Sequence, residues 1–186
     1  MLVEPFVDNE PFVVAYPDDI VLGEKPLSKQ LIETWEKTGN TVLSVQKLPE
    51  DQLWRYGVID PEDSGEIMQV KKMVEKPKHG TAPSRFVSFG RYLYTPELFD
   101  ALRTSDKSHS SKSEFTQTEA INHMAAQGHV SAVLFEGTRY DLGDPLGFLT
   151  SALQIGLQRS EFKQTLLDEM RRLLELHDNP NDENSA

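Results

Sequence analysis

The chain lacks cysteine altogether, since none of its 186 residues is of that type. This absence excludes a disulfide framework, a thiolate nucleophile and a cysteine-ligated zinc site. The first residues also lack a basic region followed by a long apolar run, which is the pattern of a secretory signal. We therefore expect a cytoplasmic protein.

Positive charge is scarce. The chain has 19 Lys and Arg residues against 30 Asp and Glu residues, for a formal net charge of −11. A nucleic-acid-binding surface needs a basic stripe, and a membrane-spanning helix needs about 20 apolar residues. Neither is present, so we expect no nucleic-acid partner and no membrane partner. A phosphate-bearing ligand would have to meet local lysines, helix N-termini or a metal ion.

The apolar pattern predicts an α/β fold. Phe12–Tyr16 is a short unbroken apolar run, which is typical of a strand buried on both faces. Leu31, Ile32 and Trp35 follow at helical spacing, and Gly39 ends that helix. A second strand is predicted from Thr41. This strand-helix-strand unit indicates a parallel pair of strands.

Similar reasoning predicts the remaining elements. A hairpin is expected from Tyr56–Asp60 and Ile67–Val74, and a further strand at Phe86–Tyr94. A helix is expected at Thr118–Gln127, followed by a last strand at Val130–Phe135. The pattern is helical from Pro145 to Leu176, in two segments broken near Arg159. We therefore expect an α/β part over residues 1–144, terminal helices over 145–176 and a disordered tail over 177–186.

Acidic residues follow two of the apolar strands. Asp18 and Asp19 come after the first strand, and Asp141 and Asp144 come after the last. Aspartate is common at helix N-caps and in tight turns, and that is one interpretation of each pair. The alternative is a metal site, because Mg²⁺ is usually bound by one or two carboxylates together with substrate oxygens.

A third charged cluster is Glu75-Lys76-Pro77. It is either an exposed charged turn or a binding element. Proline disfavours helical backbone in the residue before it, so Lys76 is predicted to be extended and to act as a fixed point charge for phosphate. Gly57 is likewise either an ordinary strand start or a place where a ligand ring approaches the backbone.

These motifs, taken in order, resemble a known family. In chain order they read Phe12-Val-Val-Ala-Tyr-Pro-Asp18, Tyr56-Gly57-Val58, Val74-Glu75-Lys76-Pro77, Gly90-Arg91-Tyr92 and Arg139-Tyr140-Asp141-Leu142-Gly143-Asp144. The sequence is similar to the sugar-1-phosphate nucleotidyltransferases, and among them to bacterial UTP–glucose-1-phosphate uridylyltransferases. The resemblance runs from about Pro5 to Leu176. It implies a Rossmann-like nucleotidyltransferase fold with a mixed sheet and C-terminal helices.

The resemblance also implies roles for individual residues. Asp18 and Asp141 would bind Mg²⁺. Glu75 and Lys76 would contact the hydroxyls and the phosphate of the sugar phosphate, and Gly57 would lie against the sugar. The implied reaction joins UTP and glucose 1-phosphate to give UDP-glucose and pyrophosphate. Asp18, Lys76 and Asp141 would be its catalytic residues.

The chain departs from the family pattern in two places. The family's Gly-Glu-Ile-Gln-Leu-Thr-Asp segment corresponds to Ser113–Glu119, where Glu114 keeps the first carboxylate as a substrate-binding residue and Glu119 replaces the aspartate. The family's Gly-x-Gly-Thr-Arg loop, which binds the nucleotide, does not occur in the sequence. We therefore expect the sugar-and-metal portion of such an enzyme. Whether the chain is a fragment, the product of a split gene or a true short protein remains open.

Two other functions remain open as well. The chain could be a non-catalytic sugar-phosphate-binding or assembly module that acts with a partner. It could also be a related nucleotidyltransferase that uses another nucleotide or another sugar, because the portion that would select the base is not in the sequence.

The terminal helices are predicted to form an oligomer contact. Their apolar residues outnumber what one short helical hairpin can bury, namely Leu149, Leu153, Leu166, Leu167, Met170, Leu173 and Leu174. The resemblance also implies dimers or tetramers. Light scattering should therefore give a mass above that of one chain. A monomer mass that does not change with protein concentration would contradict this prediction.

Overall fold

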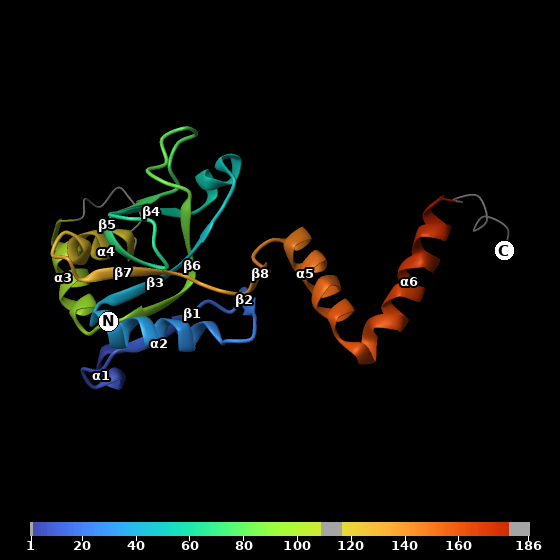
Figure 1. Ribbon diagram of the computed structural model, residues 1–186, viewed down its shortest axis with the longest axis horizontal. Coiled ribbons are helices and arrows are strands. Elements are labelled where there is room, and N and C mark those ends of the chain that lie inside the picture. The colour runs from blue at the N-terminus through green and yellow to red at the C-terminus, as the bar shows by residue number, and fades with distance from the viewer. Residues whose placement is uncertain (1, 109–116, 179–186) are drawn as a thin grey trace. The chain divides into compact units, whose positions relative to one another are not determined.

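The computed structural model describes residues 2–108 and 117–178 (Figure 1). The chain divides into two compact units, residues 1–139 and residues 140–186. The first unit contains a mixed sheet with helices, and the second contains two helices.

Unit 1 is built from short strands and three longer helices. Its elements are α1 (Glu4–Val7), β1 (Phe12–Ala15), β2 (Asp19–Leu22), α2 (Leu27–Thr38), β3 (Thr41–Lys47), the 3₁₀ helix η1 (Glu50–Arg55), β4 (Gly57–Pro61), β5 (Ile67–Glu75), β6 (Phe86–Tyr94), α3 (Glu97–Ser108), α4 (Gln117–Ala125) and β7 (Val130–Leu134). The unit ends within β8 (Thr138–Asp141), which pairs with β2 in a two-stranded sheet.

Strand β6 organises the larger sheet, whose order is β1-β6-β3-β7-β5-β4. It pairs antiparallel with β1 on one side and with β3 on the other, while β3 and β7 are parallel. β4 pairs with β5 and also with β6, at Gly57 opposite Ser88 and Val58 opposite Val87. These pairings form a closed circuit through β3, β7, β5, β4 and β6. The mixed sheet that the resemblance implied is thus confirmed.

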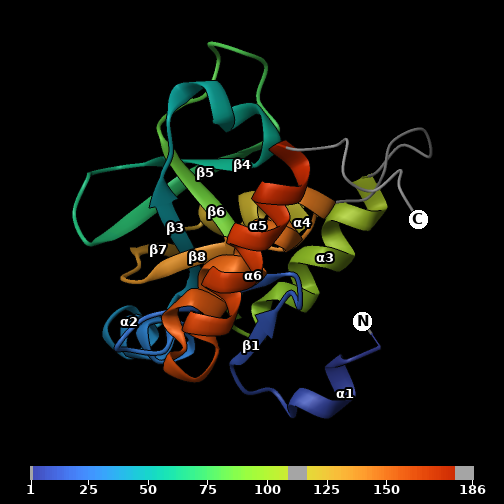
Figure 2. The same ribbon diagram turned by 90° about the vertical axis from the view of Figure 1, so that its right-hand side faces the viewer.

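Two hydrophobic cores lie on opposite faces of this sheet, and the helices that take part in them, α2, α3 and α4, are labelled in Figures 1 and 2. One core packs α3 and α4 against the sheet through residues such as Leu98 and Ile121. The other packs α2 through Leu27 and Leu31. Gly39 ends α2 at φ 71°, donating its N–H to Trp35 O at 2.7 Å. The predicted helix stop is therefore confirmed.

The first predicted strand differs from expectation in its environment. β1 forms, but its residues alternate between partly buried and exposed, and β6 is its only partner among the described strands. The expectation of burial on both faces is wrong, because alternate side chains of β1 are exposed. β1 is also an edge strand. β1 and β3 run in the same direction but are separated by β6, so the parallel neighbour of β3 is β7. The sequence patterns also did not predict α1, β2 and η1.

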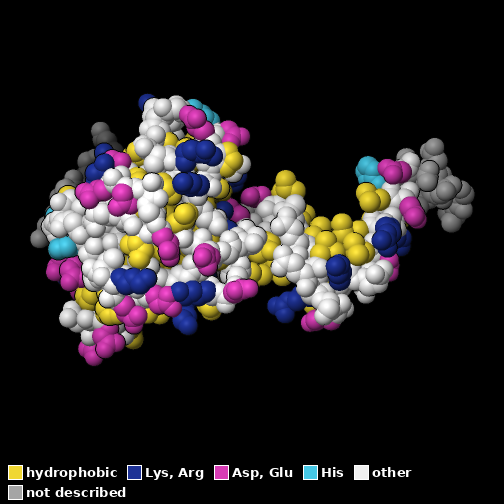
Figure 3. Space-filling model, in the orientation of Figure 1, with side chains coloured by type: hydrophobic (Ala, Val, Ile, Leu, Met, Phe, Trp, Pro, Cys, Tyr) yellow, Lys and Arg dark blue, Asp and Glu magenta, His cyan; other side chains and the backbone are white. Residues whose placement is uncertain are grey.

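Unit 2 consists of α5 (Pro145–Gln158) and α6 (Ser160–Asp178), so the predicted break near Arg159 is confirmed. The two helices contact each other, and Gly156 allows a close approach by the side chain of Leu166. Apolar side chains gather on the surface of both helices (Figure 3). None of the described helices is both long and apolar enough to cross a lipid bilayer. Residues 179–186, most of the predicted disordered tail, lie outside the described residues.

Gly90 is predicted to be required for the packing of β6. A Cβ atom added there would lie 2.6 Å from Cδ2 and 2.9 Å from Cβ of Tyr16, so a methyl group cannot be accommodated without a shift. Gly90→Ala should lower the free energy of unfolding by about 1–3 kcal/mol, the usual cost of overpacking. Urea denaturation followed by circular dichroism measures this change in the free energy of unfolding.

Gly65→Ala is the matched control. A Cβ atom at Gly65 makes only ordinary contacts, the closest being 3.4 Å from Ile67 O. This variant should stay within about 0.5 kcal/mol of the parent protein. Equal stabilities for the two variants would show that Tyr16 does not restrict position 90.

Candidate functional site

The centre of the candidate site is a row of residues across three strands. Gly57 of β4 lies opposite Glu75 of β5 and opposite Ser88 of β6. Directly opposite residues of an antiparallel pair project from the same face, so all three share one face of the sheet. A Cβ atom at Gly57 would be 3.1 Å from Glu75 Oε2 and 3.2 Å from Met73 Sδ. The absent side chain therefore leaves room for the carboxylate above the backbone.

Glu75 is anchored by a residue of α4. Thr118 Oγ1, on α4, donates to Glu75 Oε2 at 3.3 Å, and the rest of the side chain is exposed at the end of β5. A carboxylate held in this way keeps acceptor capacity for donors from solvent or from a ligand. The two residues that the resemblance assigned to the sugar, Gly57 and Glu75, are thus neighbours in the structure.

Lys76 differs from its predicted conformation. Its φ is +43°, in the left-handed region, so the prediction of extended geometry before Pro77 is wrong. The backbone turns sharply at the end of β5, while Lys76 N still donates to Tyr56 O at 3.0 Å. A left-handed backbone costs a non-glycine residue about 1–2 kcal/mol. Such strain often occurs at binding sites, although the strain alone does not identify a ligand.

A group of tyrosines lies close to this row. The rings of Tyr16 and Tyr92 are 5.9 Å apart edge to face, and Tyr94 Oη donates to Gln117 Oε1 at 2.9 Å. Burial raises the pKa of Tyr16, the charges of Glu75 and Asp18 add to this, and Gln117 opposes it. Burial likewise raises the pKa of Tyr92. These hydroxyls therefore remain protonated at neutral pH.

Sequence reasoning gave these tyrosines no role. Tyr16 and Tyr92 occur in two of the motifs that carry the family resemblance, yet their spacing of 76 positions along the chain does not indicate a contact. They meet because β1 and β6 are paired, with Ala15 opposite Arg91. The tertiary pairing of these strands was the missing information.

The two adjacent aspartates have different surroundings. Asp19 accepts from Arg139, with Nε at 2.6 Å from Oδ1, and from the Gly90 N–H at 3.0 Å. The guanidinium of Arg139 also lies 3.9 Å from the ring centroid of Phe89. Asp19 therefore ties β2 to β6 and to the start of β8. Asp18 is exposed, and among the described residues its carboxylate makes no hydrogen bond or ion pair.

Asp141 and Asp144 belong to unit 2. Asp144 is the N-cap of α5, where its Oδ1 accepts from Gly147 N at 2.9 Å. Asp141 Oδ1 accepts from Gly143 N at 3.0 Å, as in an Asx turn. The interpretation of this pair as turn and cap residues is confirmed. The metal-binding roles of Asp141 and Asp18 stay predictions.

Two further assignments remain predictions. Glu114 lies outside the described residues, while Glu119 is an exposed residue of α4. In the described ranges 2–108 and 117–178, no group of three or more His, Asp or Glu side chains is arranged to hold a metal ion. A magnesium site would therefore depend on one or two carboxylates and on oxygens of the substrate.

Comparison with protein families gives a match over most of the chain. A family model described as nucleotidyl transferase matches residues 1–156. The curated UTP–glucose-1-phosphate uridylyltransferase of Staphylococcus epidermidis is 44% identical over 162 residues, which is 87% of this chain and 56% of the relative. The enzyme of that name from Bacillus subtilis is 42% identical over 170 residues, or 91% of this chain and 58% of the relative. The chain thus spans less than two thirds of these relatives.

Solved structures show the same architecture. A crystal structure of UDP-glucose pyrophosphorylase complexed with UDP-glucose superposes with a TM-score of 0.76 at 29% identity, covering 84% of this chain and 60% of the other. A UTP-bound UGPase from Acinetobacter baumannii gives a TM-score of 0.78 at 24% identity, covering 94% of this chain and 59% of the other. Because the identity is low, this second structure supports the fold alone. The family model, the sequence relatives and the fold agree with one another. The chain belongs to the nucleotidyl transferase family.

Proposed function

We propose that this chain forms the sugar-phosphate-binding portion of a UTP–glucose-1-phosphate uridylyltransferase. The observation that carries the proposal is the position of Gly57 opposite Glu75, with the carboxylate over a backbone that has no side chain. The names of the relatives support the same activity. The reaction converts UTP and glucose 1-phosphate into UDP-glucose and pyrophosphate.

Glu75 and Gly57 suit a hexose for two reasons. A glycine lets a sugar ring approach the sheet closely, and a carboxylate accepts hydrogen bonds from hydroxyl groups. Thr118 fixes one carboxylate oxygen, so less conformational entropy is lost when a sugar binds. The negative charge of Glu75 disfavours a phosphate group in the same place, so the phosphate is assigned to Lys76.

Lys76 is the next residue along the chain and is exposed. In the proposed reaction an oxygen of the sugar phosphate forms a bond to the α-phosphorus of UTP, and the bond from that phosphorus to the β-phosphate oxygen breaks. Pyrophosphate leaves with the electron pair. An ammonium group beside the sugar phosphate screens the repulsion between the two anionic reactants and orients the attack.

A divalent cation is part of the proposal. Asp18 and Asp141 would supply carboxylate oxygens, which are the ligands that Mg²⁺ prefers. The exposed carboxylate of Asp18, with no hydrogen bond or ion pair inside the described parts of the chain, fits this role. When bound, Mg²⁺ supplies positive charge to the phosphate oxygens. Cytoplasmic location and assembly into homo-oligomers also remain predictions.

The proposed role of Lys76 can be tested by measuring sugar-phosphate binding. Lys76→Ala should weaken the binding of glucose 1-phosphate by about 1.5–3 kcal/mol, the range for a hydrogen bond to a charged group. Isothermal titration calorimetry with Mg²⁺ measures this change. Lys72→Ala is the control, because Lys72 is an exposed lysine of β5, four residues before Lys76, and should leave the affinity unchanged. Equal affinities for the two variants would refute the assignment of Lys76.

A measurement of turnover by the chain alone distinguishes an active enzyme from a binding module. The 186-residue chain alone should not make UDP-glucose at the usual enzymatic rate of about 1–10³ s⁻¹, because it lacks the Gly-x-Gly-Thr-Arg loop that holds UTP in the family. Loss of even one electrostatic donor typically costs about 10²–10³ in rate. Pyrophosphate release with UTP, glucose 1-phosphate and Mg²⁺ is the assay. A normal turnover would show that the missing loop is dispensable.

A further inference from the structure

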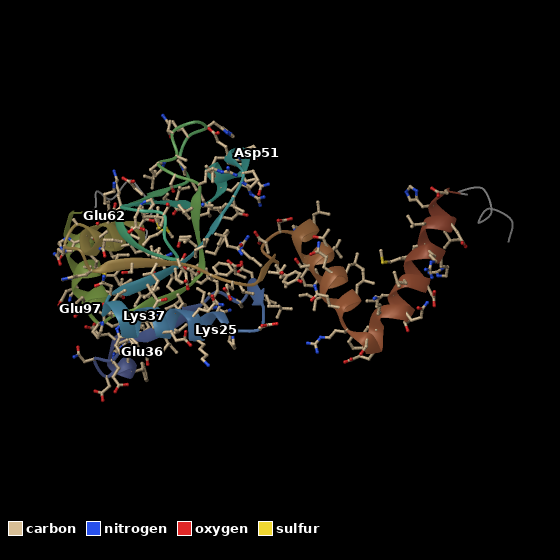
Figure 4. The ribbon with its side chains drawn as sticks, in the orientation of Figure 1. Lys25, Glu36, Lys37, Asp51, Glu62 and Glu97 are labelled. Carbon is tan, nitrogen blue, oxygen red and sulfur yellow. The ribbon has the colours of Figure 1, made fainter. Side chains whose placement is uncertain are left out.

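A surface pocket is formed by η1 and by the segment that follows β5. It is lined by Trp54, Arg55, Lys76, Pro77, Lys78 and His79. Lys76 is therefore the single residue that this pocket shares with the proposed sugar-phosphate site. Asp51, on the same 3₁₀ helix as Trp54, is labelled in Figure 4 and marks this region of the molecule.

The pocket is cationic although the protein is strongly acidic. Its lining includes an arginine, two lysines and a histidine, and contains no acidic residue, whereas the whole chain carries a formal net charge of −11. Glu50 and Asp51 begin η1 but do not line the pocket. Within the described residues, Lys76 and Lys78 form no ion pair. Their charges are therefore available to an anionic ligand.

One wall of the pocket is aromatic and held in place. The Trp54 side chain is 47% exposed, and its Nε1–H donates to Asp51 O at 2.9 Å. The imidazole of His79 lies with its centroid 5.6 Å from that of the indole, tilted by 42°. A large exposed indole whose orientation is already fixed is a platform on which a planar ring can stack at low entropic cost.

The cationic wall is also ordered by local hydrogen bonds. Lys78 O accepts from Thr81 N at 3.0 Å and from Thr81 Oγ1 at 2.8 Å, which closes a tight turn. Gly80 has φ +73° within this turn, a conformation that glycine adopts without strain. Pro77 is buried at its start. The turn therefore fixes the backbone that carries Lys78 and His79, two of the residues that line the pocket.

We propose that this pocket binds a nucleotide, with the base stacked on Trp54 and the phosphates between Lys76 and Lys78. A cationic group of side chains beside an exposed indole matches the two parts of such a ligand, a polyanion and a planar ring. Stacking on an aromatic side chain tolerates any base. Adenine and uracil nucleotides should thus bind similarly.

This site goes beyond the proposed transfer reaction, which requires a uridine nucleotide. Because Lys76 lines the pocket, a bound nucleotide engages the same ammonium group that is proposed to hold the sugar phosphate. An occupied pocket should therefore weaken the binding of glucose 1-phosphate. The pocket would act as an inhibitory site that senses nucleotide concentration.

Tryptophan fluorescence of the full 186-residue chain provides the test. The chain has only two tryptophans, of which Trp35 is partly buried against the core and Trp54 is exposed and lines the pocket, so a ligand in the pocket should act on the emission of Trp54. Titration with ADP and with UDP should quench the emission with similar dissociation constants. Uridine without phosphates and pyrophosphate without a base should each bind at least about tenfold more weakly than UDP.

Two variants assign the ligand to the pocket. Trp54→Leu should weaken ADP binding, measured by calorimetry, by about 5- to 100-fold, which corresponds to the energy of one base stacked on an aromatic ring. Lys78→Ala should weaken it by about tenfold and reduce its salt dependence. Lys72→Ala, outside the pocket, should change neither the affinity nor the quenching. Circular dichroism of each variant establishes that the fold is retained.

The remaining outcomes overturn the inference. An absence of quenching, an unchanged affinity in the Trp54 variant, or pyrophosphate binding as tight as that of UDP would each show that the pocket does not hold a nucleotide. If glucose 1-phosphate binding still depends on Lys76 in that case, the proposed function stands without the inference. If ADP binds through Trp54 while glucose 1-phosphate does not bind at all, the proposed function falls and the nucleotide pocket remains.

Discussion

The backbone hydrogen bonds of β6 hold three other strands in register, and the structure of unit 1 depends on that constraint. β6 pairs with β1 along one edge, with β3 along the other, and with β4 at its start. Each pairing fixes which side chains share a face, because residues directly opposite each other project in the same direction. Gly90 in the middle of β6 allows Tyr16 to pack against the strand, so the end of β1 is held as well. A register shift of one residue in β6 would separate these contacts.

The candidate site depends on this arrangement. β4 lies between β5 and β6, so that Gly57 has Glu75 on one side and Ser88 on the other. Asp19 provides a second connection, since it accepts from Arg139 and from the backbone of β6. That ion pair is largely shielded from water and lies against the Phe89 ring, where breaking it would leave a poorly solvated charge. Of two adjacent aspartates, one is therefore structural and the other stays exposed to solvent.

Phosphate recognition by so acidic a chain requires a local concentration of cations. Lys76, Lys78 and Arg55 gather where β5 ends and η1 approaches it, and no acidic side chain lines the same pocket. The strained backbone at Lys76 directs the chain into the turn that carries Lys78. At ordinary ionic strength surface charges act over only about 8–10 Å. Carboxylates farther away than this therefore reduce the local potential only weakly.

Local patterns in the sequence were enough to predict the order of the longer helices and strands and to indicate the family. The apolar run at Phe12, the glycine after α2 and the break at Arg159 are local signals, and motifs such as Glu75-Lys76-Pro77 are contiguous in the chain. The edge position of β1, the pairing of Arg139 with Asp19 and not with Asp18, and the contact of Tyr16 with Tyr92 became apparent from the folded chain alone. The same is true of the left-handed backbone of Lys76. The physical reason is that strand neighbours are set by pairings between distant segments, and hydrophobic patterning records burial without recording partners.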